Sequence, residues 1–223
     1  MSGRQQYSQA SILAGNKLES ALDPTIFNPK LAPEQLIELA LAAAERPVIT
    51  TNFRPGAIAL LHMVTRQFPA IPVIWVDTGF NTAATYRYVE RLKIRFGLNL
   101  KVYTPRVEFK LNNQAGSAFP APSEPEFKAF VELVKLEPFR RAFDELRPDV
   151  WLTGIRSDQT EYRRSLSVVS AGPNDSHKVA PILRWTAGDV DQYIANHGLP
   201  QEYDYFDPTK PEEHLECGLQ LVS

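Results

Sequence analysis

Two kinds of hydrophobic pattern alternate along the chain. Short apolar runs rich in Val, Ile and Trp are typical of strands that are buried on both faces, whereas longer stretches with apolar residues three or four positions apart are typical of amphipathic helices. The predicted strands are residues 48–51, 73–76, 100–103, 149–153 and 178–185. The predicted helices are residues 33–44, 57–68, 83–96 and 187–197, with two more within 126–146 that are separated at Pro138. This alternation predicts an α/β domain with a doubly wound, mostly parallel sheet.

The segments that flank this pattern differ from it in composition. Residues 1–32 are polar, and we expect a peripheral N-terminal segment there, with a short helix at 11–22 and a contribution to a dimer contact. Residues 33–200 form the predicted nucleotide-binding α/β domain, and residues 201–223 form a mobile C-terminal tail. The Pro- and Ser-rich stretch 112–125 is predicted to be a mobile loop or lid.

Composition narrows the function classes. The 223 residues carry 24 basic and 26 acidic side chains, a formal net charge of −2, so no basic field indicates nucleic-acid binding. No apolar run reaches membrane-spanning length and the first residues lack the apolar stretch of a signal peptide, so we expect a cytoplasmic protein without a membrane partner. The single cysteine, Cys217, excludes a disulfide framework within the chain, a thiolate-only metal site and an iron–sulfur cluster held by one chain.

The loop after the first predicted strand is a candidate anion site. A helix follows this loop, and the first N–H groups of a helix have no partner within it. Thr50, Thr51 and Asn52 add side-chain donors beside those groups. The alternative is an ordinary turn between a strand and a helix, and the loop is not a Walker loop because no Gly-Lys-Ser/Thr follows.

Further polar side chains follow two other predicted strands. Asp77 and Thr78 come directly after residues 73–76, and Arg156 and Arg163 lie in the polar segment after the strand at 149–153. Ligands of doubly wound sheets bind at the carboxyl ends of the strands, where these residues fall. The two arginines are suited to hold phosphate or sulfate through bidentate hydrogen bonds. A solvated loop with surface charges is the alternative for the arginine segment.

Five short motifs follow one another along the chain. They are Asp77-Thr78-Gly79-Phe80, Lys135-Leu136-Glu137-Pro138, Gly154-Ile155-Arg156-Ser157-Asp158-Gln159 with Arg163, Pro181-Ile182-Leu183 with Trp185, and Glu216-Cys217-Gly218-Leu219. This ordered set resembles the phosphoadenylyl-sulfate (PAPS) reductase family over roughly residues 33–220, and the terminal Glu-Cys-Gly-Leu is its most specific part. The resemblance implies an adenine nucleotide alpha hydrolase-like (PP-loop-like) fold and a homodimer.

The resemblance also implies an activity, the reduction of 3′-phosphoadenylyl sulfate to sulfite and adenosine 3′,5′-bisphosphate in sulfate assimilation. Cys217 is then the catalytic nucleophile that takes the sulfonate group, and thioredoxin or glutaredoxin releases sulfite, since a lone thiol cannot form an intramolecular disulfide. Matching positions imply substrate binding by Thr50, Thr51, Asn52, Phe53, Arg54, Asp77, Thr78, Gly79, Lys135, Gly154, Arg156, Gln159 and Arg163. No metal and no iron–sulfur cluster is expected.

Three features depart from the family pattern. Arg54 and Pro55 stand in the phosphate loop where the family has Gly-x, and Gln220 stands where it usually has His. The family's Gly-Tyr-x-Ser-Ile-Gly segment before the cysteine is missing. The alternatives to a thioredoxin-dependent PAPS reductase are another nucleotide enzyme of the same fold (a cluster-free adenylyl sulfate reductase or an adenylyl-transferring relative) and a non-catalytic nucleotide-binding protein. An inert surface thiol is the alternative for Cys217.

Overall fold

The computed structural model describes residues 22, 31–106, 120–121, 123 and 125–209. Cys217, the rest of the terminal Glu-Cys-Gly-Leu motif and most of the predicted helix at 11–22 lie outside these described residues. The predicted loop at 112–125 lies largely outside them as well.

A six-stranded sheet forms the centre of the described part of the chain. Its strands are β1 (Pro47–Thr50), β2 (Pro72–Val76), β3 (Asn99–Tyr103), β4 (Val150–Leu152), β5 (Val169–Ala171) and β6 (His177–Val179). They are arranged in the order β3-β2-β1-β4-β6-β5, and all neighbours are parallel except β5 and β6. The chain leaves β1 toward β2 on one side and reaches β4 on the other, so a topological switch point lies between β1 and β4.

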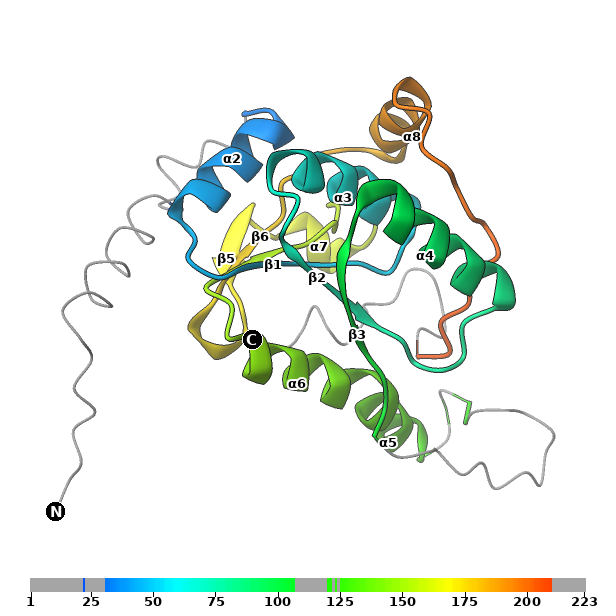
Figure 1. Cartoon of the computed structure of the whole chain (residues 1–223). Coiled ribbons are helices and arrows are strands. Elements are labelled where there is room, and N and C mark those ends of the chain that lie inside the picture. The colour runs from blue at the N-terminus through cyan, green and yellow to red at the C-terminus, as the bar shows by residue number, and fades with distance from the viewer. Residues whose placement is uncertain (1–21, 23–30, 107–119, 122, 124, 210–223) are drawn as a thin grey trace, which may run out of the picture.

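Helices cover both faces of the sheet (Figure 1). They are α2 (Pro33–Ala43), α3 (Pro55–Gln67), α4 (Ala83–Phe96), α5 (Phe127–Val131), a π-helical turn η1 (Glu132–Leu136), α6 (Glu137–Leu146), α7 (Glu161–Arg164), a 3-10 turn η2 (Pro173–Asp175) and α8 (Ala187–Asn196). Figure 1 shows α2, α3, α4 and α8 on one side of the sheet and α5 and α6 on the other. This arrangement confirms the predicted doubly wound α/β fold.

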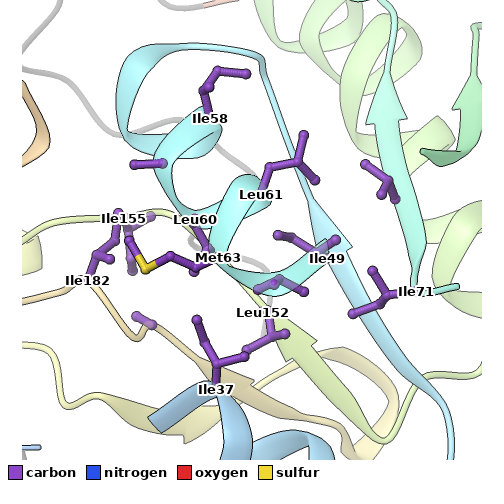
Figure 2. Packing of buried hydrophobic residues seen from close by; sticks show 14 of the residues in the cluster. Ile37, Ile49, Ile58, Leu60, Leu61, Met63, Ile71, Leu152, Ile155 and Ile182 are labelled. Atoms are coloured by element: carbon purple, nitrogen blue, oxygen red, sulfur yellow. The ribbon is translucent and has the colours of Figure 1, made fainter. Parts of the chain in front are cut away.

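The sheet separates two hydrophobic cores, because successive strand residues point to opposite faces. In β1, Ile49 joins the larger core with α2 and α3, whereas Val48 joins the smaller one beneath α6. Figure 2 shows the larger core, in which Leu60 and Leu61 of α3 pack over the sheet. The smaller core is aromatic, and the fully buried Trp151 lies with its ring centroid 5.4 Å from that of Phe139.

The predicted strand at 178–185 is wrong in length. β6 ends at Val179, and the chain then turns, with Leu183 N–H donating to Ala180 O and Trp185 N–H donating to Ile182 O. Ile182 and Leu183 are fully buried in this turn, so their apolar run reflects burial and not extended backbone. The antiparallel strand β5 was not predicted, because its sequence, Val-Ser-Ala, is too short to show an alternating pattern.

The predicted break at Pro138 is also wrong. Helical backbone continues from α5 through η1 into α6, and the Glu137 N–H donates to the carbonyl of Glu132, five residues back. A proline in a helix lacks an N–H and its ring crowds the carbonyl four residues earlier. The wider π turn accommodates both defects, and such turns are frequent at functional sites. Lys135 lies within this turn.

Candidate functional site

A pocket of about 530 Å³ opens at the carboxyl ends of β1, β2 and β4, at the topological switch point. The predicted binding residues that line it are Thr50, Thr51, Asn52, Arg54, Thr78, Lys135, Gly154, Arg156, Gln159 and Arg163. Phe53, Asp77 and Gly79 are not among the lining residues. Lining residues that sequence reasoning did not assign include Trp75, Asn81, Phe139, Val190, Tyr205 and Asp207.

The loop between β1 and α3 is shaped by its own side chains. Thr51 Oγ1 accepts the N–H of Phe53 (3.0 Å), and Asn52 Oδ1 accepts the N–H of Arg54 (3.2 Å). Within the described residues, the N–H groups of Gly56 and Ala57 in the first turn of α3 make no hydrogen bond. These two donors and the positive end of the helix dipole make the turn an anion site.

Phe53 supports this loop from below. Its backbone has a positive φ of 58° and its side chain is only 3% exposed. The ring packs edge-on against Trp75, with centroids 5.4 Å apart. The Phe53 side chain therefore does not line the pocket, and it anchors the loop in the hydrophobic core.

Gly154, two residues after the end of β4, lies against the first turn of α3. A Cβ at position 154 would stand 3.1 Å from Ala57 Cα and 3.3 Å from the carbonyl oxygen of Gly56. Both are backbone atoms, so they cannot rotate away. Position 154 therefore requires glycine so that the two strand-end loops can approach each other.

We expect Gly154→Ala to lower the free energy of unfolding by about 1–3 kcal/mol, because the helix and the loop must separate. Denaturant unfolding monitored by circular dichroism measures this change. Gly188→Ala is the matched control: a Cβ there would meet only Thr186 Oγ1 at 3.7 Å, and α8 gains a better helix former. Equal stability of the Gly154 variant and the wild type would contradict the close packing.

Asp77 organises the end of β2. Its Oδ1 accepts hydrogen bonds from the Gly79 N–H (3.0 Å), the Asn81 side-chain amide (2.8 Å) and the Tyr86 hydroxyl (3.0 Å). Burial, with the charge and hydrogen bond of Asp77, raises the pKa of Tyr86 to about 12, so this phenol remains a donor at neutral pH. Asp77 thus holds the turn that presents Thr78 and Asn81 to the pocket.

Arg156 enters the pocket from the loop after β4 with its guanidinium fixed. Asp158 accepts two hydrogen bonds from it, Nε to Oδ1 at 3.0 Å and Nη2 to Oδ2 at 3.3 Å. Asp158 Oδ2 also accepts the N–H of Ala187 at the start of α8 (3.0 Å). The Nη1 atom of Arg156 lies 3.2 Å from where a Cβ on Gly56 would stand, so the guanidinium reaches the anion site at the start of α3.

Arg163 is supplied by the short helix α7. Thr160 caps this helix by accepting the Arg163 N–H (3.2 Å), and the Arg163 side chain, 8% exposed, donates from Nη1 to Gln159 Oε1. The same Gln159 oxygen accepts the Arg156 N–H at 3.0 Å. Gln159 therefore links the backbone of one arginine to the side chain of the other.

The segment after α8 forms the remaining wall of the pocket. Tyr205, Phe206 and Asp207 line it, and the guanidinium of Arg54 lies 5.0 Å from the ring centroid of Tyr205. Figure 1 shows this segment running from α8 past α4 toward the sheet. The sequence did not predict that residues 201–209 contribute to the pocket, because nothing in their composition indicates where they pack.

Lys135 and Asp207 form an ion pair in this wall. The Lys135 ammonium donates to Asp207 Oδ2 and to Thr209 Oγ1, the latter at 2.7 Å. Burial raises the pKa of the Asp207 carboxyl, but the Lys135 charge and the hydrogen bonds from Lys135 and Thr209 outweigh it, so the net effect is a lowered pKa. Asp207 is therefore ionised at neutral pH.

Among the side chains that the structure describes, no group of three or more His, Cys, Asp or Glu residues is placed to hold a metal ion. None of the described helices combines the length and the apolar character needed to cross a bilayer.

Comparison with known proteins identifies the family. A model of the phosphoadenosine phosphosulfate reductase domain matches residues 46–205, a range that holds all the pocket-lining residues except Phe206 and Asp207. The chain belongs to this family. It is 35% identical over 181 residues to a phosphoadenosine 5′-phosphosulfate reductase of a Synechococcus species, covering 79% of this chain and 78% of that protein. It is 30% identical over 216 residues to the enzyme of that name from Photobacterium profundum, covering 95% of this chain and 83% of that protein.

The solved structures agree on the fold of this reductase-family chain. A crystal structure of phosphoadenylyl-sulfate reductase from Candida auris, a phosphate complex, superposes with a TM-score of 0.65. It covers 89% of this chain and 91% of that one at 24% sequence identity, which supports a shared fold alone. The predicted adenine nucleotide alpha hydrolase-like fold is confirmed.

Proposed function

We propose that this protein reduces 3′-phosphoadenylyl sulfate to sulfite and adenosine 3′,5′-bisphosphate in sulfate assimilation. The observation that carries the proposal is the family match over residues 46–205, which spans the strand-end pocket. Two relatives that bear the name of this reductase align with 79% and 95% of the chain. A pocket lined by Arg54, Arg156 and Arg163 suits a nucleotide that carries several phosphate and sulfate groups.

The anionic groups of the nucleotide bind between the first turn of α3 and the arginines. The N–H groups of Gly56 and Ala57 point out of the helix end, and Arg156 Nη1 lies beside them. Ile74 and Trp75, at the end of β2, provide apolar surface suited to the adenine ring. This arrangement holds the nucleotide in place, and the nucleophile that attacks its sulfate sulfur comes from outside the described pocket wall.

Cys217 is that nucleophile. Its thiolate attacks the sulfate sulfur, a sulfur–sulfur bond forms, and the bond from this sulfur to the bridging phosphate oxygen breaks. Adenosine 3′,5′-bisphosphate leaves with the bonding electron pair, and the protein carries an S-sulfonate on Cys217. Residues 201–209 of the predicted tail contribute to the pocket wall, so we assign the movement by which Cys217 reaches the nucleotide and then a partner protein to the chain that follows them.

An external dithiol completes the cycle. A thiolate of thioredoxin or glutaredoxin attacks the Cys217 sulfur, and sulfite departs with the electron pair of the broken sulfur–sulfur bond. The second thiol of the donor then resolves the mixed disulfide, so two electrons pass from the donor to the substrate sulfur. Cys217 is the only cysteine in the chain, which is why the donor must supply both thiols.

The remaining properties follow from the same proposal. The enzyme uses no iron–sulfur cluster, because one cysteine per chain cannot supply the four thiolates of such a cluster. The 3′-phosphorylated nucleotide is accordingly the preferred substrate over adenylyl sulfate. The enzyme works as a cytoplasmic homodimer without nucleic-acid or membrane partners.

A sulfite-release assay tests the function. The purified protein is incubated with 3′-phosphoadenylyl sulfate and reduced thioredoxin, with adenylyl sulfate as the competing substrate. We expect thioredoxin-dependent sulfite from the 3′-phosphorylated nucleotide. Tight binding of adenosine 3′,5′-bisphosphate without any sulfite would contradict the reductase and indicate a non-catalytic nucleotide-binding protein.

A further inference from the structure

Lys135 lines the pocket, where a basic side chain could bind the anionic groups of a nucleotide. Its hydrogen bonds indicate a different role. We propose that Lys135 and Asp207 are positioning residues that dock the segment leading to the C-terminus onto the pocket. This inference rests on the proposed function, because it assigns the docked segment a part in the same reaction.

Three side-chain groups form a closed hydrogen-bonded ring at this place. The Lys135 ammonium donates to Asp207 Oδ2 and to the hydroxyl of Thr209 (2.7 Å), and that hydroxyl donates to Asp207 Oδ1. The Thr209 N–H also donates to Asp207 Oδ1 at 3.0 Å. Lys135 and Thr209 are each 6% exposed, so the ring satisfies polar groups that would be costly to bury alone.

The charge of Lys135 is offset inside the pocket itself. Asp207 also lines the pocket and is ionised, so the pair presents little net positive charge to a polyanionic nucleotide. Arg156 differs, because its carboxylate partner Asp158 is not a lining residue and its Nη1 reaches the first turn of α3. We therefore assign Arg156 to nucleotide binding and Lys135 to holding the segment after α8.

Other contacts show that the ring is one of several points that hold the same segment. The hydroxyls of Thr82, which caps α4, and of Thr85 in its first turn both donate to the carbonyl oxygen of Asp204, each at 3.0 Å. The Tyr88 hydroxyl donates to the carbonyl oxygen of Pro200 at 2.6 Å. Among these contacts, the Lys135–Asp207 ion pair is the one between opposite charges. The hydrogen bond from Lys135 to Thr209 holds the last described residue.

The location of Lys135 explains how a helix residue can reach the tail. It lies in the π-helical turn η1, where the hydrogen bond from Glu137 N–H spans five residues. The extra residue in this turn shifts the direction in which side chains leave the helix, compared with an uninterrupted α-helix. The chain thus places the ammonium between the sheet end and the segment after α8.

The two roles of Lys135 predict opposite effects on binding and turnover. A nucleotide ligand, when removed, weakens nucleotide affinity; a docking residue, when removed, lowers turnover and leaves affinity nearly intact. We expect Lys135→Met and Asp207→Asn each to lower kcat by about 10²-fold, because the segment that precedes Cys217 is no longer held. We expect the Kd of adenosine 3′,5′-bisphosphate, and the Kd of intact 3′-phosphoadenylyl sulfate measured in a Cys217→Ser background, to stay within about threefold of the values without these substitutions.

The experiment combines three measurements on the full chain. Calorimetric titration gives Kd for adenosine 3′,5′-bisphosphate and, in the Cys217→Ser background, for 3′-phosphoadenylyl sulfate. The thioredoxin-coupled assay gives kcat, and amide hydrogen exchange reports on residues 200–209. We expect faster amide exchange in residues 200–209 in both variants. We expect the Lys135→Met/Asp207→Asn double variant to turn over no more slowly than the slower single variant, because the pair acts as a unit. Arg140→Met is the matched control, because it breaks an exposed ion pair with Glu132 on the same helical stretch.

Each outcome decides between the roles. A Kd that rises tenfold or more in Lys135→Met but not in Asp207→Asn overturns the docking role and makes Lys135 a nucleotide ligand. Unchanged amide exchange at 200–209 in both variants also overturns it. If the wild-type protein releases no sulfite, the proposed reductase function is wrong and the expected effect on turnover falls with it. The exchange measurement would still decide whether Lys135 holds residues 200–209.

Discussion

We expect Cys217→Ser to lower sulfite release by a factor of about 10³ or more and to leave the affinity for adenosine 3′,5′-bisphosphate unchanged. A serine hydroxyl is not ionised at neutral pH and forms no sulfur–sulfur bond with the substrate, so no S-sulfonate arises for thioredoxin to cleave. The substitution replaces one sulfur atom by an oxygen atom and leaves every described pocket-lining residue in place, so we expect nucleotide binding to persist.

The measurement is the thioredoxin-coupled rate beside the calorimetric Kd of the same preparation. Cys217→Ala serves as a second variant, because it lacks a hydroxyl that could act as a weak substitute nucleophile. Turnover at the wild-type rate in either variant would make the thiol an inert surface group and would favour another enzyme of the same fold.

We expect Arg156→Gln to weaken nucleotide binding by about 10- to 100-fold, because charge-assisted hydrogen bonds to the nucleotide are lost in a partly buried site. The side chain of Arg156 is 12% exposed, and the Asp158 carboxylate holds its guanidinium toward the start of α3. Arg156→Lys keeps the charge but not the planar donor set, so we expect an intermediate Kd.

Arg164→Gln is the control for this prediction. Arg164 lies in the same short helix as Arg163, but its side chain is 66% exposed and its ion-pair partner is Glu161 at 3.8 Å. Calorimetric titration with adenosine 3′,5′-bisphosphate should give a wild-type Kd for this variant. Equal losses in the Arg156 and Arg164 variants would mean that general surface charge attracts the nucleotide, and a fixed guanidinium in the pocket would be excluded.

The fold was largely predictable because its strands are buried on both faces. Runs such as Val73-Ile74-Trp75-Val76 are continuous and apolar, and this pattern marks parallel strands covered by helices. The same rule misled at Ile182 and Leu183, which are buried in a turn and not in a strand. An apolar run reports burial, and the backbone conformation that achieves the burial depends on the surrounding structure.

The pocket residues that follow strands could be predicted from the sequence. The pocket residues of the segment after α8 could not. Thr50, Thr78 and Arg156 follow strands, and parallel strands bring their ends together. Asp207 lies 72 residues from Lys135, and no local pattern indicates that pairing. Phe53 shows the limit of matching positions to a family, because its side chain lies in the core beside Trp75.

The central claim is that Cys217 receives the sulfonate group of the nucleotide that the pocket holds. The most direct measurement is the intact mass of the protein after incubation with 3′-phosphoadenylyl sulfate in the absence of any reductant, followed by peptide mapping. We predict a mass gain of one sulfonate group, located on Cys217 and removed by reduced thioredoxin. An unmodified mass, with calorimetry showing the nucleotide bound, would contradict the claim.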